Sequence, residues 1–464
     1  MFLAATTYLN PDEVMHASTG FQHSGLGLWK AAFEWHHPPL LVVLVGWMGN
    51  FSLAEWWLRL IPVLAGTFAS LFAGLWAHRL TGDRRAAWIC GCIILFAPNL
   101  VLLSAQLRGY SLALCFGALA LWALEGVFAN PGWRTVAQFT TFLFFALLSE
   151  YNAAWLAAGS GVYVLLRWRD LPATARKAWV GGQLACASLC CFLLLATIWG
   201  KIHETSWESM ATSYLSSGFP AVGQNWLSFS VVGLVKQFAY LFGSSVSAVL
   251  GLILFAIAIV TLPWRTGALF LVPFLGANAA ALLRMFPYGR LRHSSILALF
   301  IAAGLGVAWV WLVRRIPRYH LALAAVLVEF VAITFESDSL NNIPYSRHQL
   351  TSMNRGLAEM RRQIPFGTTI LVDQETAYVL GFYLYGRNFR LQPQDVISPT
   401  TPYSLQWHSW NQFQIPAPSS PPVWIADSGF TIALPESFRT VRREPAVSFN
   451  FDDALVFVRF GPQP

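Results

Sequence analysis

Two adjacent carboxylates, Asp12 and Glu13, lie near the start of the chain in the segment NPDEVMHA. A carboxylate can accept a proton from an attacking hydroxyl or amine, so this pair could supply a general base. If a helix begins here, His16 shares a face with Asp12, because positions i and i+4 are neighbours on a helix. The pattern equally fits a plain helix start, with Asn10 or Asp12 as the N-terminal cap and Glu13 at the positive end of the helix dipole. Both interpretations stay open at this point.

A second group that could do chemistry consists of basic residues beside apolar runs. Its members are Arg108, Lys201, Arg284, Arg290 and Arg292. Cations at such positions attract anions, and Arg can bind a phosphate through two parallel hydrogen bonds. The alternative is that each one contacts lipid head groups or caps the end of a helix.

The composition of the chain is that of an integral membrane protein. It is 56% hydrophobic and 11% charged, with a mean hydropathy of +0.52, whereas soluble domains are about 25% charged. The net charge of +8 falls mostly in short turns between apolar runs, as membrane topology requires, so we do not expect a nucleic-acid partner. All six cysteines lie inside apolar runs, which excludes a disulfide framework and a CxxC metal site.

Apolar runs predict the membrane spans, since a spanning helix needs about 17 to 25 residues. Two shorter runs, 135–149 and 151–166, meet at Glu150, and we interpret them as a hairpin of two spans with Glu150 at its turn. In all, the sequence predicts a polytopic α-helical membrane protein with about 10–11 spans. The other runs are 60–77, 86–107, 111–128, 178–200, 244–262, 266–283, 294–313 and 319–335.

Basic turns predict the orientation of these spans. The turns 78–85, 167–177 and 314–318, and the turns that hold Arg134 and Arg265, carry clustered Arg and Lys and are expected in the cytoplasm. Alternation then puts the remaining polar segments on the outer face, which are 10–58, 104–110, the Glu150 turn, 201–243, 284–293 and everything after about 336. Basic residues are usually concentrated in cytoplasmic loops, so several of them on the outer face indicate an anionic partner.

The two ends of the chain differ from its middle. The stretch MFLAATTYL would reach only about 13 Å as a helix and cannot span, so either the chain starts too late or its first helix is incomplete. The short apolar segment 38–51 is expected to be an interfacial or re-entrant helix.

Residues 336–464 should form a small α/β soluble domain after the membrane domain, 1–335. We expect strands at 369–373, 423–427 and 454–460, a helix at 375–386, and a loop from Tyr403 to Pro422.

Several short motifs in a fixed order resemble a known superfamily. They are the Asp12-Glu13 pair in the first outer loop, HHPPLL (36–41), EWWLRLIPVLAG (55–66) and SAQLRGYSL (104–112). Together they resemble the GT-C superfamily of polyprenyl-phosphate-sugar glycosyltransferases, most nearly the protein O-mannosyltransferase-like family 39 and the lipid A aminoarabinose transferases. The segment FPYGRLRHS (286–294) is also similar to a loop of bacterial members.

This resemblance implies an enzyme of the cell envelope. It would move a hexosyl or pentosyl group from a polyprenyl-phosphate donor to a protein, lipid or glycan acceptor, inverting the anomeric carbon. The site would face the extracytoplasmic side of the inner (plasma) membrane. Asp12 would be the general base with Glu13 beside it, and the anionic leaving group needs cations around it. The donor phosphate would be bound by His37, Arg108, Tyr110, Lys201, Tyr288, Arg290, Arg292 and His293. His37 replaces a lysine that is common in relatives, so it supplies charge only when protonated.

The sequence departs from its relatives at a place where a metal ligand is common. Gln106 stands two positions before Arg108, where relatives often have an acidic residue. Glu13, Glu150 and Glu204 could replace it, but their spacing is not diagnostic of a metal site. We therefore expect no cofactor and a metal-independent enzyme, with a divalent cation left open.

Other functions fit parts of the same pattern. A multi-span transporter of a lipid or sugar is the main alternative, although only Glu125 and Glu329 interrupt the predicted spans and no inverted repeat or matched pair of broken helices is visible. A polymerase or ligase of lipid-linked polysaccharide would also use outward arginines, but it needs no acidic pair in the first loop. A catalytically inactive scaffold is a further alternative. No motif specifies the sugar, the acceptor or the polyprenol length.

Overall fold

The computed structural model describes residues 1–34, 37–193, 195–196, 215–289, 292–316, 349–388, 403–407, 423–428, 447–452 and 454–460. The chain divides into two compact units, one made of Met1–Ala32, Val42–Leu60 and Asn342–Pro464 and the other of Phe33–Leu41 and Ile61–Asn341. Much of the first predicted outer loop thus belongs with the C-terminal domain, whereas the sequence placed a single boundary at 335/336. The reason is a set of long-range contacts, including the Tyr8 hydroxyl donating to the carbonyl oxygen of Ser428 at 2.6 Å.

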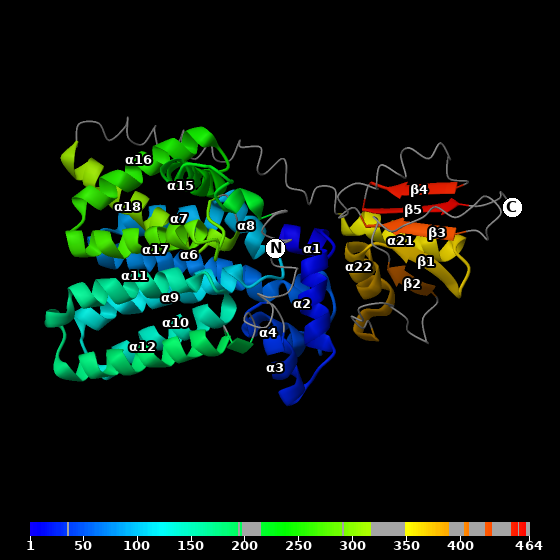
Figure 1. Ribbon diagram of the computed structural model, residues 1–464, viewed down its shortest axis with the longest axis horizontal. Coiled ribbons are helices and arrows are strands. Elements are labelled where there is room, and N and C mark those ends of the chain that lie inside the picture. Colours follow the sequence, from blue (N-terminus) through cyan, green and yellow to red (C-terminus); the bar gives the residue numbers. More distant parts are fainter. Residues whose placement is uncertain are drawn as a thin grey trace. The chain divides into compact units, whose positions relative to one another are not determined.

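The first unit combines short N-terminal helices with a small mixed sheet (Figure 1). Its sheet has the order β2-β1-β3-β5-β4, in which β1 runs parallel to β2 and β3 and β5 runs antiparallel to β3 and β4. Helix α22 contacts β2, and α21 contacts β4 and β5. The helices are α1 (Phe2–Thr6), α2 (Pro11–Phe21), α3 (Gly25–Glu34), α4 (Pro39–Met48), α5 (Glu55–Leu58), α21 (Leu350–Gln363), α22 (Gln374–Tyr385) and the 3₁₀ turn η7 (Gly386–Asn388), with α3 and α4 divided between the units. The strands are β1 (Thr368–Val372), β2 (Tyr403–Trp407), β3 (Val423–Asp427), β4 (Val447–Phe451) and β5 (Leu455–Phe460).

The small α/β domain confirms most of its predicted elements to within one residue, namely β1, β3, β5 and α22. The predicted loop from Tyr403 to Pro422 is wrong for its first five residues, because these form β2. In β2 the apolar Tyr403 and Leu405 are buried while Gln406 is exposed, an alternation that the neighbouring prolines obscured in the sequence. Strand β4 and helix α21 were not among the predicted elements.

The second unit is a bundle of helices (Figure 1). They are α6 (Leu60–Thr81), α7 (Arg84–Phe96), α8 (Pro98–Ser104), α9 (Tyr110–Ala129), α10 (Trp133–Ser149), α11 (Ala153–Leu166), α12 (Ala173–Leu193), α15 (Trp226–Phe242), α16 (Ser245–Thr261), α17 (Trp264–Leu282) and α18 (Leu297–Arg315), with the 3₁₀ turns η1 (Trp168–Asp170), η3 (Ser216–Gly218) and η4 (Arg292–Ser294). Every predicted span up to 294–313 coincides with a helix in its described part except 86–107, which is divided between α7 and α8. Glu150 lies between α10 and α11 as expected. The predicted span 319–335 lies outside the described residues.

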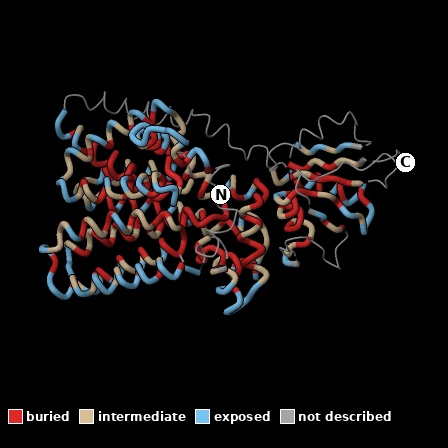
Figure 2. The backbone as a smooth tube through the Cα atoms, viewed as in Figure 1, coloured by how far each residue is buried: buried red, intermediate tan, exposed pale blue. Residues whose placement is uncertain are grey.

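The length and apolar character of the helices in this unit support the conclusion that the chain is a membrane protein. In the described part of the chain, four helices are long and apolar enough to cross a membrane, or up to six if each of two bent pairs is one span. Among these four helices, α18 is the most deeply buried. Within its apolar segment, 78% is buried, whereas the value for α17 is 44%. Helix α12 is the opposite case, because most of its residues are exposed or half-buried (Figure 2). Its apolar Leu184 is among the exposed residues. An exposed apolar helix surface of this kind suits a lipid environment.

Two sharp bends have local causes. Helices α7 and α8 meet at 62° next to Pro98, which lacks an amide hydrogen and clashes with the preceding turn. Helices α15 and α16 meet at 111°, where Gly243 ends α15 in the left-handed conformation with φ of 72°. The sequence had assigned the region of α15 to an outer segment, because Lys236, Gln237 and several serines weaken its apolar pattern.

Candidate functional site

Helix α2 begins with a complete N-terminal cap, and this cap fixes the positions of Asp12 and Glu13 in the first turn of the helix. The Asn10 side chain accepts a hydrogen bond from the Glu13 amide at 3.0 Å, and Glu13 Oε2 accepts one from the Asn10 amide at 2.9 Å. Pro11 occupies the first helical position, where its missing amide hydrogen costs nothing. Asn10 rather than Asp12 is therefore the cap, and Asp12 lies half-buried in the first turn, on the same helix as His16.

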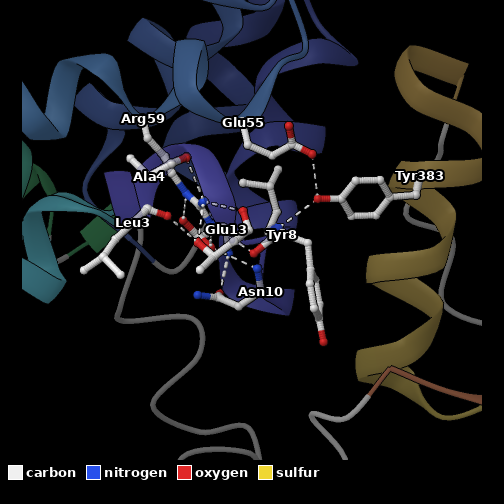
Figure 3. Close-up of polar contacts among 10 residues, drawn as sticks. Leu3, Ala4, Tyr8, Asn10, Glu13, Glu55, Arg59 and Tyr383 are labelled. Carbon is white, nitrogen blue, oxygen red and sulfur yellow. Dashed lines mark hydrogen bonds and ion pairs between the residues drawn. The ribbon is translucent and has the colours of Figure 1, made fainter. Parts of the chain in front are cut away.

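The Glu13 carboxylate is bound by Arg59, and both side chains are fully buried (Figure 3). Arg59 donates from Nε to Oε1 at 2.8 Å and from Nη2 to Oε2 at 2.7 Å. Its Nη1 also donates to the Thr7 carbonyl at 2.8 Å, and its Nη2 to the Tyr8 carbonyl at 3.0 Å. A two-point arginine–carboxylate pair with further backbone acceptors compensates the cost of burying both charges. This network fixes the segment before α2 to the residue that precedes α6.

A tyrosine from the C-terminal domain completes the same network. The Tyr383 hydroxyl accepts a hydrogen bond from the Leu9 amide at 2.9 Å and donates one to Glu55 Oε1 at 2.9 Å (Figure 3). Burial, followed by the nearby Glu55 charge, raises the pKa of Tyr383 well above its ordinary value, so the phenol stays protonated. Through Tyr383, helix α22 of the C-terminal domain therefore contacts the segment that directly precedes α2.

Other carboxylates from the C-terminal domain lie near Asp12. Burial, and then the charges of Asp373, Asp12 and Asp427, raise the pKa of Glu375 on α22, against the lowering effect of a backbone hydrogen bond. Asp373 caps α22 by accepting a hydrogen bond from the Thr376 amide at 2.7 Å. Asp12 and Glu375 thus lie in a region that is rich in carboxyl groups.

A second cluster forms in the helical unit around Arg108. Arg108 lies in the link between α8 and α9 and is 4% exposed, and Tyr110 begins α9. Tyr110 interacts electrostatically with Arg108, Arg292 and Tyr240. Its hydroxyl lies 3.4 Å from Nδ1 of His293, and the two rings meet edge to face. Two guanidinium groups, two phenols and an imidazole therefore converge on one region, which is a chemically suitable environment for a phosphate.

Glu150 brings a negative charge to the same cluster. It ends α10, is buried, and interacts with Arg108 and Arg292. Burial raises the pKa of its carboxyl to about 8, although both arginines act to lower it. The backbone at Gly109 passes beside it, because a Cβ there would overlap the Ser149 carbonyl oxygen and lie 3.2 Å from Glu150 Oε1.

The loop that holds Arg292 is fixed by hydrogen bonds to neighbouring helices. The Asn152 side chain donates to the His293 carbonyl at 2.9 Å, and the Gln237 side chain donates to the Ser294 carbonyl at 3.2 Å. The Tyr288 amide donates to the Gly218 carbonyl at 2.9 Å, and the buried Tyr288 ring lies against Gly233 of α15. Such contacts hold Arg292 and His293 in place beside Tyr110.

The predicted site residues fall into two groups. Arg108, Tyr110, Arg292 and His293 come together in the helical unit, whereas Asp12 and Glu13 belong to the first unit. Tyr288 is in the same loop as Arg292, and half-buried His37 precedes α4. Lys201 and Arg290 lie outside the described residues.

Several residues of both clusters were not predicted. Arg59 was part of a recognised motif but was not singled out, although a lone arginine directly before an apolar run is a usable signal. Tyr240 and Asn152 lack any such signal, because each is a common polar residue within or beside an apolar helix. Within the described ranges, no three His, Cys, Asp or Glu side chains are grouped so that they could hold a metal ion.

Comparison with known proteins identifies the fold. A scan against protein-family models finds no match, and neither does a search of curated proteins. Among solved structures, ArnT from Cupriavidus metallidurans in its apo state matches with a TM-score of 0.53 and 15% identity over 99% of this chain and 95% of that one. The chain has the ArnT fold.

The likeness holds for a second state of the same protein. ArnT bound to undecaprenyl phosphate also gives a TM-score of 0.53 at 15% identity, over 98% of this chain and 95% of ArnT. An Archaeoglobus fulgidus oligosaccharyltransferase matches with a TM-score of 0.49 and 12% identity, over 79% of this chain and 56% of that one. The ArnT fold is the fold that the sequence resemblance led us to expect.

Proposed function

We propose that this protein is a membrane glycosyltransferase that moves a sugar from a polyprenyl-phosphate donor to an acceptor. The observation that carries the proposal is the cluster of Arg108, Arg292, Tyr110 and His293 in a chain with the ArnT fold. Undecaprenyl phosphate is bound in one of the ArnT structures, and two buried or half-buried arginines beside phenols suit the same kind of head group here. His37, Lys201, Tyr288 and Arg290 belong to this proposed donor site on the sequence motifs alone.

In the proposed reaction, the acceptor hydroxyl or amine attacks the anomeric carbon and the bond from that carbon to the phosphate oxygen breaks. The configuration inverts, because the attack and the departure occur on opposite faces. Polyprenyl phosphate leaves with an additional negative charge, which Arg108 and Arg292 would stabilise. The acceptor is a protein, a lipid or a glycan.

Asp12 is the proposed base that takes the acceptor proton. The support for this role is its place in the acidic pair of the sequence motif, in which Asn10 caps α2 and Arg59 binds the neighbouring Glu13. We propose that Glu13 acts at the site by holding the first turn of α2 in place. The site and the C-terminal domain would face the extracytoplasmic side of the plasma membrane, in accordance with the cytoplasmic location that the sequence predicts for the basic turns.

The donor site can be tested with charge-conserving variants. Arg108→Lys or Arg292→Lys should lower the release of undecaprenyl phosphate from undecaprenyl-phosphate-linked sugars by about tenfold, because Lys cannot form two parallel bonds to a phosphate. Arg315→Lys at the end of α18 is the matched control and should retain wild-type turnover. Undecaprenyl phosphate added as a competitor should inhibit the wild type. Equal activity of all three variants without competition would exclude the proposed donor site.

Transport of a lipid or sugar is the second candidate, favoured by the bent pairs α7–α8 and α15–α16. Broken helices line substrate paths in many transporters, and the sequence had shown no such pair. Reconstituted vesicles separate the two functions: flux of undecaprenyl-phosphate-linked sugar across the bilayer without cleavage would support transport, and cleavage without flux would support the transferase.

A further inference from the structure

A group of basic residues lies in the helical unit where α11 ends and where α12 and α17 begin. Its members, which we call the basic corner, are Arg167, Arg169, Arg176, Lys177 and Arg265. Asp170 joins two of them, since its Oδ2 lies 3.2 Å from Arg167 Nε and 3.6 Å from Arg265 Nη1. Arg176 Nη2 donates a hydrogen bond to the Arg169 carbonyl at 3.4 Å. These contacts bring the starts of α12 and α17 to the same turn.

The basic corner carries more positive charge than its contacts balance. Asp170 pairs with Arg167 and Arg265. In the described part of the chain, no acidic side chain pairs with Arg169, Arg176 or Lys177. Arg169 and Lys177 are also exposed. A turn with several uncompensated cations at its surface attracts an anion.

The surface that continues from the basic corner is apolar. Helix α12 lies at the edge of the helical bundle, where it packs against α10 (Figure 1). Lys177, Val180 and Leu184 share one face of α12, because positions i, i+3 and i+7 recur on the same side of a helix. Val180 is 47% exposed and Leu184 is 64% exposed. An amphiphile fits this face, with its charged group at Lys177 and its chain along the next about 10 Å of the helix.

Two tryptophans lie at the same level as the cations. The guanidinium carbon of Arg176 is 5.9 Å from the centroid of the Trp168 ring, and that of Arg265 is 5.8 Å from the Trp264 ring. Trp264 is the first residue of α17 and is 67% exposed. Tryptophan is enriched where lipid head groups meet the hydrocarbon layer. The two pairs therefore favour a position of the basic corner at the depth of lipid phosphates.

We propose that the basic corner binds an anionic phospholipid of the surrounding bilayer. Arg169 and Lys177 contact the head-group phosphate, and an acyl chain lies along Val180 and Leu184. A soluble anion would match the cations alone and leave the apolar face uncovered, whereas a negatively charged phospholipid matches both. This inference goes beyond the proposed function and does not depend on it, because none of these residues belongs to the proposed donor site.

The test is lipid binding to the full-length protein, measured by native mass spectrometry from detergent micelles. The probes are dioleoylphosphatidylglycerol, which carries a negative charge, and dioleoylphosphatidylcholine, which has the same chains and no net charge. The wild type should bind the first phosphatidylglycerol about tenfold more tightly than the first phosphatidylcholine, because each nearby cation strengthens binding of an anionic lipid. Arg169→Gln combined with Lys177→Gln should remove most of this preference and leave the affinity for phosphatidylcholine unchanged.

Helix α21 of the first unit offers a matched control. Arg355→Gln combined with Arg361→Gln removes the same amount of charge from two exposed positions, and this variant should keep the wild-type preference. Glycerol phosphate, which has the phosphate but no acyl chains, should not displace phosphatidylglycerol from the wild type even in large excess. Displacement would identify a site for soluble phosphate and overturn the lipid assignment.

The variants decide whether the basic corner is the site. A preference for phosphatidylglycerol that is lost in the corner variant and kept in the α21 variant supports the inference. A preference that both variants keep, or that both lose equally, would overturn it. If the double variant does not fold, Arg169→Gln and Lys177→Gln should each lower the preference by about threefold, and an unchanged preference in both would also overturn it.

Discussion

Arg59 and Glu13 form a two-point ion pair with 0% of either side chain exposed, although 46 residues separate them in the sequence. Arg59 also binds three backbone carbonyl oxygens of the first eight residues, from Ala4, Thr7 and Tyr8. The two residues of the acidic pair therefore have different roles in this account. Glu13 organises the start of α2, and Asp12, the preceding residue, is the base that we propose.

Breaking this pair should destabilise the first unit. Arg59→Met leaves the Glu13 carboxylate buried without its partner, which should cost about 3–5 kcal/mol in the free energy of unfolding. The control is Arg355→Met, which removes an ion pair with Asp452 whose side chains are 67% and 65% exposed, and that change should cost less than about 1 kcal/mol. Denaturant unfolding of both variants measures the difference, and equal losses would contradict a structural role for the buried pair.

Asp12→Asn tests the proposed base. The amide keeps the shape of the side chain but cannot take a proton, so sugar transfer should fall by about 10²- to 10⁴-fold. The unfolding temperature should fall by only a few degrees, since Asn10 supplies the cap of α2 and a charge in the first turn contributes about 0.3–1 kcal/mol. Transfer assays and thermal unfolding on the same preparation are needed. Near wild-type turnover would remove Asp12 from the mechanism.

The acidic surroundings of Asp12 predict a pH-dependent stability. Burial and the neighbouring carboxylates raise the pKa of Glu375 above its unfolded value. A carboxyl with a raised pKa favours folding while it is protonated, and this contribution is lost as the pH rises from about 4 upward. Glu375→Gln should therefore unfold about 2 °C higher than the wild type at pH 7.5, and the two should converge near pH 4.

Glu359 provides the opposite case on the same domain. Its side chain accepts hydrogen bonds from Arg362 and Gln363, which lower its pKa. A carboxyl with a lowered pKa favours folding while it is ionised, so Glu359→Gln should unfold slightly lower than the wild type at pH 7.5. A Glu375→Gln variant that behaves like Glu359→Gln would contradict the assigned cause.

The sequence predicted those features that depend on neighbours along the chain. Apolar runs located the helices of the second unit, and β-branched runs located β1, β3 and β5. Helix α15 was missed because Lys236 and Gln237 interrupt its apolar pattern, and β2 because prolines follow it. These are local signals that tertiary packing overrides.

The site could be predicted only in part for the same reason. The motifs gave Arg108, Tyr110, Arg292 and His293, which do come together. They could not decide between a catalytic and a capping role for Glu13, because its partner Arg59 lies 46 residues away. Glu150 was seen only as a turn residue and a spare carboxylate, since its relation to Arg108 and Arg292 depends on the packing of three separate segments.

The location of a bound lipid phosphate tests the central claim most directly. The measurement is a cryo-electron microscopy structure of the wild type in nanodiscs with undecaprenyl phosphate at saturating concentration. The account predicts phosphate density within about 3 Å of the guanidinium groups of both Arg108 and Arg292. Phosphate density remote from both arginines, or a lipid-free cluster at saturation, would contradict it.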